Sequence, residues 1–150
     1  MCVGLVEVHP YRFTAVTEID AEVIRETRQF AALQTAAMAR LAIPRLGEGD
    51  RAWASQLADE AAATIHGGGE WLPAHARLLE HLFRRTENRL FSFLLEDLWF
   101  VVLRNLTQTD LSMDERVAIA TAVTDLGAAI LAADVSQAEA AARRMFGNFD

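Results

Sequence analysis

The stretch VIRETRQFAALQTAAMARL, residues 23–41, decides the fold class, because its apolar and small residues recur at the spacing of one helix face. Thr17 or Asp20 can cap the start of this helix, and Pro44 predicts that it stops at about Ala42. A helix of this length needs other helices to cover its inner face. That face is predicted to hold Val23, Ile24, Thr27, Phe30, Ala31, Gln34, Met38 and Leu41.

Beyond this stretch, helical patterns account for most of the chain. They predict helices over residues 50–65, 71–85 and 88–106, the last of them apolar nearly all round and therefore placed in the middle of a bundle or in an interface. Two capping boxes, Ser112 with Glu115 and Ser136 with Glu139, open two further helices, the second ending at Gly147. The fold class predicted is all-α, an antiparallel bundle of about six helices.

Composition and charge exclude several classes of function. The 150 residues carry a net charge of −7, and all fourteen basic residues are arginine. An acidic surface repels phosphate, so this chain is a poor candidate for gripping nucleic acid by itself. The single cysteine, Cys2, excludes a disulfide framework, and neither a signal peptide nor a membrane span is indicated. We expect a cytoplasmic protein without a membrane partner.

The segment GLVEVHPYRF, residues 4–13, differs from the rest of the chain. Strand-forming residues precede Pro10 and follow it up to Val16, which predicts a β-hairpin. A two-stranded hairpin is not stable alone, so a helical bundle does not account for it.

Three segments taken together resemble the FadR-type regulators of the GntR family. Residues 4–42, GLVEVHPYRFTAVTEIDAEVIRETRQFAALQTAAMARLA, resemble the wing hairpin and first effector-domain helix of that family. LLEHLFRRTENRLFSFLLEDL (78–98) resembles its FHxxLxxASGNPLLxxLLxxL pattern, and AAILAADVSQAEAAARRMF (128–146) its xAIxAGDxxxAExAMRxHL pattern. The chain departs from the family at Phe13, where the wing has glycine, and at Glu87-Asn88, where the family has Gly-Asn.

The resemblance implies an organisation and a role. Residues 1–17 would be the remnant of a winged-helix wing and its linker, and residues 18–150 a helical ligand-binding and dimerisation domain. Its partners would be a small-molecule effector and a second copy of the chain, with helix surfaces around residues 21–42 and 90–106 as candidate dimer contacts. DNA would be bound only through a head missing from this chain.

The family commonly holds a metal through an Asp-x-x-x-His pair and two further histidines. Aligned on Asn88 and Asp134, those positions are His75, Leu79, Val123 and Met145, of which one can ligate a metal. The resemblance therefore predicts no metal and no cofactor, and an apolar cavity instead. The candidate effector-binding residues are Arg28, His75, Leu79, Val123 and Met145.

His75 and Arg28 also have simpler, purely structural interpretations. His75 lies on an apolar helix face and is more simply a core histidine hydrogen-bonded to a neighbour. Arg28 corresponds to the family's effector-binding arginine, but an ion pair with Glu96 or Asp97 is equally consistent with the sequence. An apolar cavity with Arg28 and His75 as its polar contacts favours an effector with a hydrocarbon or aromatic body and one acidic end.

Two other classes of function remain open at the level of sequence. One is a stand-alone helical module that binds a small molecule or a partner protein and never DNA. The other is a small helical enzyme, which ranks last because the chain shows no phosphate loop, no G-x-S-x-G and no paired carboxylates on one helix face. We expect no enzymatic activity.

Overall fold

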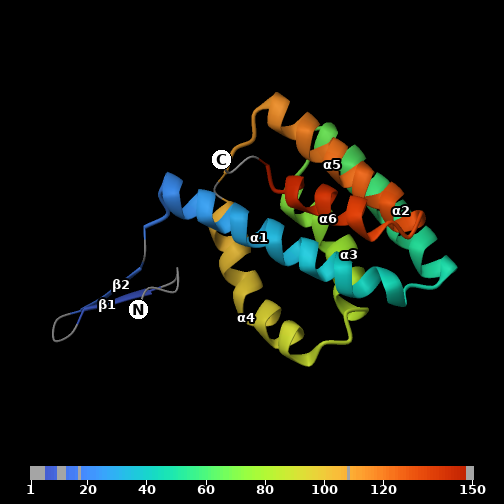
Figure 1. The fold of residues 1–150 in the computed structure, drawn as a ribbon. Coiled ribbons are helices and arrows are strands. Elements are labelled where there is room, and N and C mark those ends of the chain that lie inside the picture. The colour runs from blue at the N-terminus through green and yellow to red at the C-terminus, as the bar shows by residue number, and fades with distance from the viewer. Residues whose placement is uncertain (1–5, 10–12, 17, 108, 148–150) are drawn as a thin grey trace.

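The computed structural model describes residues 6–9, 13–16, 18–107 and 109–147. Helices occupy most of this part of the chain (Figure 1). They are α1 (Ala21–Ala42), the 3-10 turn η1 (Ile43–Arg45), α2 (Glu48–His66), α3 (Trp71–Arg84), α4 (Arg89–Leu106), α5 (Met113–Leu131) and α6 (Val135–Arg144). The predicted all-α bundle is confirmed.

The helix ends follow local chemistry. Asp20 caps α1 by accepting a hydrogen bond from the Val23 amide at 2.8 Å. The other candidate cap, residue 17, lies outside the described residues. Pro44 falls in η1 directly after α1, where its missing amide interrupts the helix as expected.

One of the two predicted capping boxes is present. Ser112 and Glu115 exchange both hydrogen bonds at the start of α5. The box predicted at Ser136 and Glu139 is wrong, because Asp134 takes the N-cap of α6 and accepts from the Gln137 amide at 3.0 Å. Glu139 instead accepts a hydrogen bond from Arg40 of α1 at 3.1 Å.

The most extensive helix contact joins α2 and α5, which are far apart in the sequence. The two backbones approach closely at Gly127, where an added Cβ would lie 2.6 Å from the Cβ of Ala58. The α6 helix packs against both α5 and α1, and α3 covers α2. Small side chains thus set the spacing on this side of the bundle.

The α4 helix is placed differently. It packs mainly on α1 and makes only a slight contact with α3, so it forms one edge of the bundle (Figure 1). Its apolar side chains are therefore only partly buried in the core. Leu90 is 84% exposed, Phe93 68% and Phe100 61%.

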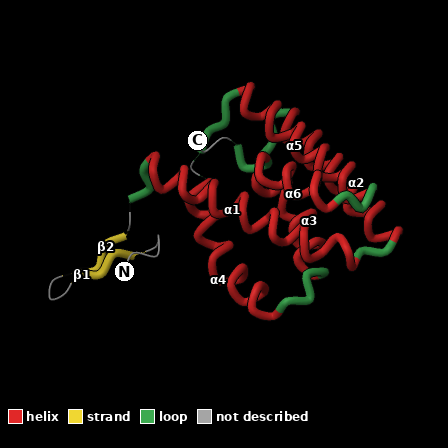
Figure 2. The backbone as a smooth tube through the Cα atoms, viewed as in Figure 1, coloured by secondary structure: helices red, strands yellow, loops and turns green. Residues whose placement is uncertain are grey.

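Ahead of α1, two short strands pair antiparallel. They are β1 (Val6–His9) and β2 (Phe13–Val16), in a register that sets Val6 opposite Val16 and His9 opposite Phe13. Figure 2 shows them apart from the helices, beyond the first turn of α1. The residues between the strands, 10–12, lie outside the described part of the chain.

No helix in the described residues is long and apolar enough to cross a membrane.

Candidate functional site

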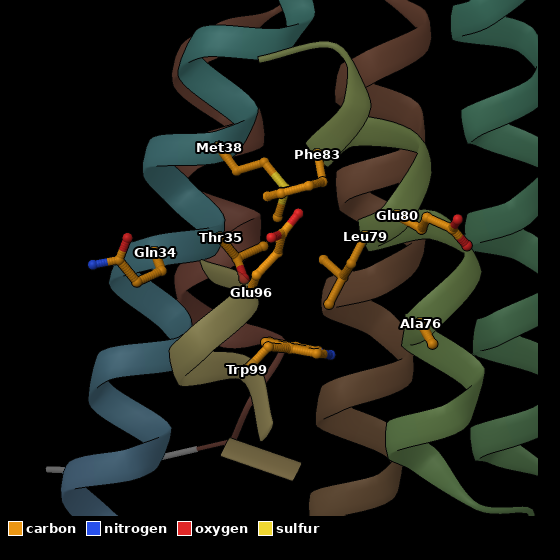
Figure 3. Close-up of a pocket in the computed structure, with 9 residues that line it drawn as sticks. All are labelled: Gln34, Thr35, Met38, Ala76, Leu79, Glu80, Phe83, Glu96 and Trp99. Carbon is orange, nitrogen blue, oxygen red and sulfur yellow. The ribbon is translucent and has the colours of Figure 1, made fainter. Parts of the chain in front are cut away.

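A pocket of about 180 Å³ lies between α1, α3 and α4 and opens to solvent on one side (Figure 3). Its walls are almost wholly apolar surface. The α1 helix contributes one wall, α3 the opposite one, and α4 closes the space between them. The lining residues are Gln34, Thr35, Met38, Ala76, Leu79, Glu80, Phe83, Glu96 and Trp99.

Helical spacing explains how the walls are built. Thr35 and Met38 are one turn apart on α1 and both are buried, while Leu79 and Phe83 are one turn apart on α3. If α4 lay fully between these two facing apolar stripes, its side chains would fill the space between them. Because α4 packs chiefly on α1, space remains in front of α3.

Two carboxylates belong to the pocket lining, and they point in different directions. Glu80 forms an ion pair with Arg84 one turn along α3, at 2.5 Å, and points away from the pocket in Figure 3. Glu96 projects from α4 into the space between α1 and α3.

His75 lies on α3 one turn before Leu79, and it is completely buried. Neither ring nitrogen has a hydrogen-bond partner among the described residues. Desolvation by burial lowers the pKa of His75 from 6.5 to about 3, so the imidazole is neutral at physiological pH. The sequence-based reading of a buried histidine holds, while its expected hydrogen bond to a neighbour is missing here.

Aromatic rings surround His75 and connect it to the pocket. Trp71 meets the imidazole edge to face with ring centroids 5.7 Å apart, and Phe146 meets it at 5.6 Å. Phe146 in turn contacts Trp99, with centroids 6.4 Å apart. Trp99 therefore belongs both to the pocket wall and to the aromatic cluster that encloses His75.

The positions that correspond to the family's metal ligands are all buried. His75 and Leu79 lie on α3, Val123 on α5, and Met145 caps the end of α6. One imidazole among two aliphatic side chains and a thioether is not a donor set for zinc or nickel. Among the described residues, no group of three His, Cys, Asp or Glu side chains gathers around one point. The residues present do not fit a metal.

Arg28 is placed away from the pocket lining. Its Nη1 lies 3.2 Å from Oε1 of Glu115, the capping-box glutamate of α5, and its side chain is 8% exposed. Hydrogen bonds from Ser112 to Glu115, and then the hydrogen bond and charge of Arg28, lower the pKa of the Glu115 carboxyl. An ion pair for Arg28 was one sequence-based alternative, and Glu115 is a partner that the sequence did not suggest.

Of the five predicted site residues, one lines the pocket. That residue is Leu79; Arg28, His75, Val123 and Met145 lie outside its lining. Sequence reasoning missed the α1 wall and Phe83, and it treated Glu96 only as a possible partner for Arg28. The available signal was the pair of adjacent acidic residues, 96 and 97, that interrupts the apolar run 90–106.

Comparison with known proteins gives a fold and no family assignment. No family model matches the chain, and no curated protein matches it. Among solved structures, E. coli McbR/YncC is similar with a TM-score of 0.71 and 17% sequence identity. The match covers 96% of this chain and 74% of that one. This chain therefore shares the fold of McbR/YncC over nearly all of its length.

Proposed function

We propose that this chain is the effector-sensing and dimerisation domain of a GntR/FadR-type transcription regulator. The fold supports this, because McbR/YncC is a regulator of the GntR family. The observation that carries the proposal is the pocket between α1, α3 and α4, which offers a small molecule an apolar site against the helix that follows the hairpin.

The α1 helix is the element through which a ligand would act. It contains 22 residues and is about 33 Å long at the usual rise per residue. Gln34, Thr35 and Met38 in its second half line the pocket, and β2 precedes its first half. A ligand that prefers one spacing of α1 and α4 shifts the population of that spacing, and the start of α1 moves with it.

A buried polar contact holds α1 to α4 near that start. Asn105 Nδ2 of α4 donates to Thr27 Oγ1 of α1 at 2.9 Å, and Thr27 Oγ1 donates to the Val23 carbonyl oxygen. Such a bond is costly to break without a replacement, so it favours pivoting over separation of the two helices. We propose that this contact acts as the pivot.

The hairpin fits the proposal as part of a wing. In that arrangement a DNA-reading head lies outside these 150 residues, and the net charge of −7 keeps the helical domain itself off DNA. About a quarter of McbR/YncC has no counterpart in this chain, which is consistent with such a division. We expect the protein to work in the cytoplasm.

Dimerisation is proposed through the exposed α4 face, formed by Leu90, Phe93 and Phe100, with the outer surface of α1 beside it. These three residues recur at spacings of three and seven along one side of the helix. A two-fold dimer would bury that face against its own copy.

Light scattering at micromolar concentration tests the dimer. We expect the unmodified chain to be a dimer and the double variant Phe93→Glu/Phe100→Glu to be a monomer. Leu131→Glu, at an exposed apolar position at the end of α5, is the control and should leave the dimer intact. A monomeric unmodified chain would contradict the proposal.

Thermal-shift screening tests the sensing role. Organic acids, amines, alcohols and acyl thioesters with apolar bodies are screened against the unmodified chain and against Ala76→Phe, which fills the pocket from α3. A true ligand raises the melting temperature by mass action, and only in the chain with an open pocket. If no compound does so, the sensing proposal fails.

The runner-up is a stand-alone helical interaction module that never binds DNA. The exposed α4 face favours it, because the same surface can receive a partner protein. The gene sequence upstream of the Met1 codon separates the two. An in-frame winged helix of about seventy residues, the size of a small domain, supports the regulator, and an immediate stop codon supports the module.

A further inference from the structure

The polar end of the ligand can be derived from the charges around the pocket. None of the described residues that line it is basic, and its acidic members are Glu80 and Glu96. The charge of Glu80 is compensated by Arg84. No ion pair or hydrogen bond engages Glu96 among the described residues, and its carboxylate points into the space between α1 and α3 (Figure 3).

The surroundings of Glu96 suit a cation. Trp99 is one turn along α4 on the same side, and Phe83 lies across the pocket on α3. The faces of aromatic rings carry negative potential and attract cations, most strongly those of tryptophan. A carboxylate beside an indole, in a pocket whose wall surface is almost wholly apolar, therefore offers a positive group both a counter-charge and a π face.

The basic residue that an acidic ligand would need is engaged elsewhere. Arg28 is bound to Glu115 and does not line the pocket. His75 is outside the lining as well, and its burial keeps it neutral. An anionic group placed in the pocket would face Glu96 without a compensating charge from the lining residues, and burying it would be unfavourable.

We infer that the pocket binds amines: a compact aromatic or alkyl body with one protonated nitrogen, the body between α1 and α3 and the ammonium group at Glu96. This inference rests on the proposed sensing function and names its ligand class. The volume limits the body, because an engineered cavity of about 150 Å³ holds a benzene ring. A pocket of about 180 Å³ suits one ring with a short chain.

Three matched probes test the charge preference: 3-phenylpropylammonium, 3-phenylpropanol and 3-phenylpropionate. They share a ring and chain and differ in the end group. By calorimetry on the full chain we expect the ammonium ion to bind most tightly, the alcohol more weakly and the carboxylate weakest of all.

Two isosteric variants assign the preference to a residue. Glu96→Gln keeps the shape of the pocket and removes the charge, so the ammonium ion should bind about tenfold more weakly while the alcohol is unchanged. Glu48→Gln, at an exposed position of α2 outside the pocket lining, is the matched control, and all three affinities should stay as they are. Melting temperatures of the free variants establish that both are folded.

The outcomes separate this inference from the proposed function. If the carboxylate binds best, or if Glu96→Gln changes nothing while Ala76→Phe abolishes binding, the amine assignment is wrong and the sensing pocket stands. If no probe binds while the wider screen finds a ligand that Ala76→Phe excludes, the amine assignment is wrong and the sensing pocket stands. If Ala76→Phe leaves binding intact, this pocket is not the sensing site and both proposals fail.

Discussion

The two sides of the bundle are packed by different means. On the side of α2, α5 and α6, glycine and alanine let the helix backbones approach closely, and Gly127 has no room for a methyl group beside Ala58. On the side of α1, α3 and α4, large residues such as Phe83 and Trp99 meet around open space. Small residues fix one distance between helices, whereas large side chains can repack. The loosely filled side is therefore where binding and movement are expected.

The sharpest test of this difference is the same enlargement on both sides. Gly127→Leu should lower the free energy of unfolding by about 3 kcal/mol, because the backbones of α2 and α5 must separate. Ala76→Leu projects into the pocket and should change it by less than about 1 kcal/mol. Urea denaturation measures both. Gly49→Leu is the control for losing a glycine, since nothing lies within 4 Å of a Cβ there. Equal costs at Gly127 and Ala76 would remove the contrast.

Acid should weaken the boundary between the two sides, where His75 of α3 meets Phe146. The pKa of His75 is lowered from 6.5 to about 3 in the folded chain, so below pH 6.5 the unfolded chain takes up a proton that the folded chain does not. Stability then falls as the pH falls, by about 2 kcal/mol between pH 7 and pH 5.

The pH dependence should be assignable by substitution. His75→Leu removes the titrating group. The difference in the free energy of unfolding between pH 7 and pH 5, measured by denaturation, should therefore shrink by the part that His75 contributes. His66→Gln, at an exposed position at the end of α2, should retain it. A His75→Leu variant with an undiminished loss at pH 5 would point to another residue.

The side formed by α2, α5 and α6 also contains a residue with a strained backbone. Ala133 joins α5 to α6 with φ of 55°, a left-handed conformation that costs a residue with a Cβ about 1 kcal/mol. Ala133→Gly should therefore stabilise the fold by about that amount. Ala132→Gly is the matched control, because Ala132 has φ of −76° and gains nothing from glycine. Thermal unfolding of the pair should shift in opposite directions, and a destabilised Ala133→Gly would refute the argument.

The smallest effect is expected at the exposed α4 face. Phe93→Gln removes an aromatic side chain that is mostly in water, so the stability of the monomer should change by less than about 0.5 kcal/mol. The same substitution should weaken dimerisation in dilution experiments. A large loss of monomer stability would mean that Phe93 belongs to the core.

Much of the fold was readable from the sequence because it is local. Helical spacing and Pro44 located α1, and a serine with a glutamate three residues later marked the start of α5. The box at Ser136 was a false signal, since Asp134 is an equally good cap two residues earlier. The pairing of α2 with α5 was not readable, because alanine-rich faces carry little information about their partners.

The site was harder to predict than the fold. The pocket exists because α4 sits on α1 without closing on α3, and no local pattern reports such an offset. The resemblance pointed to the positions of a metal site, of which Leu79 alone lines the pocket. The role proposed for Glu96 depends on the side chains that the fold packs around it, and these neighbours cannot be identified from the sequence around position 96.

The pairing of distant helices bears on how the chain folds. The contacts of α2 with α5 and of α1 with α6 close long loops, whereas helices of an up-and-down bundle meet their sequence neighbours. Each helix can form within microseconds, but the best contacts reward the chain only after the entropy of loop closure has been lost. We expect the protein to fold more slowly than an up-and-down bundle of equal size. In native-state hydrogen exchange, the amides of α4 should exchange first and those of the α2–α5 pair last.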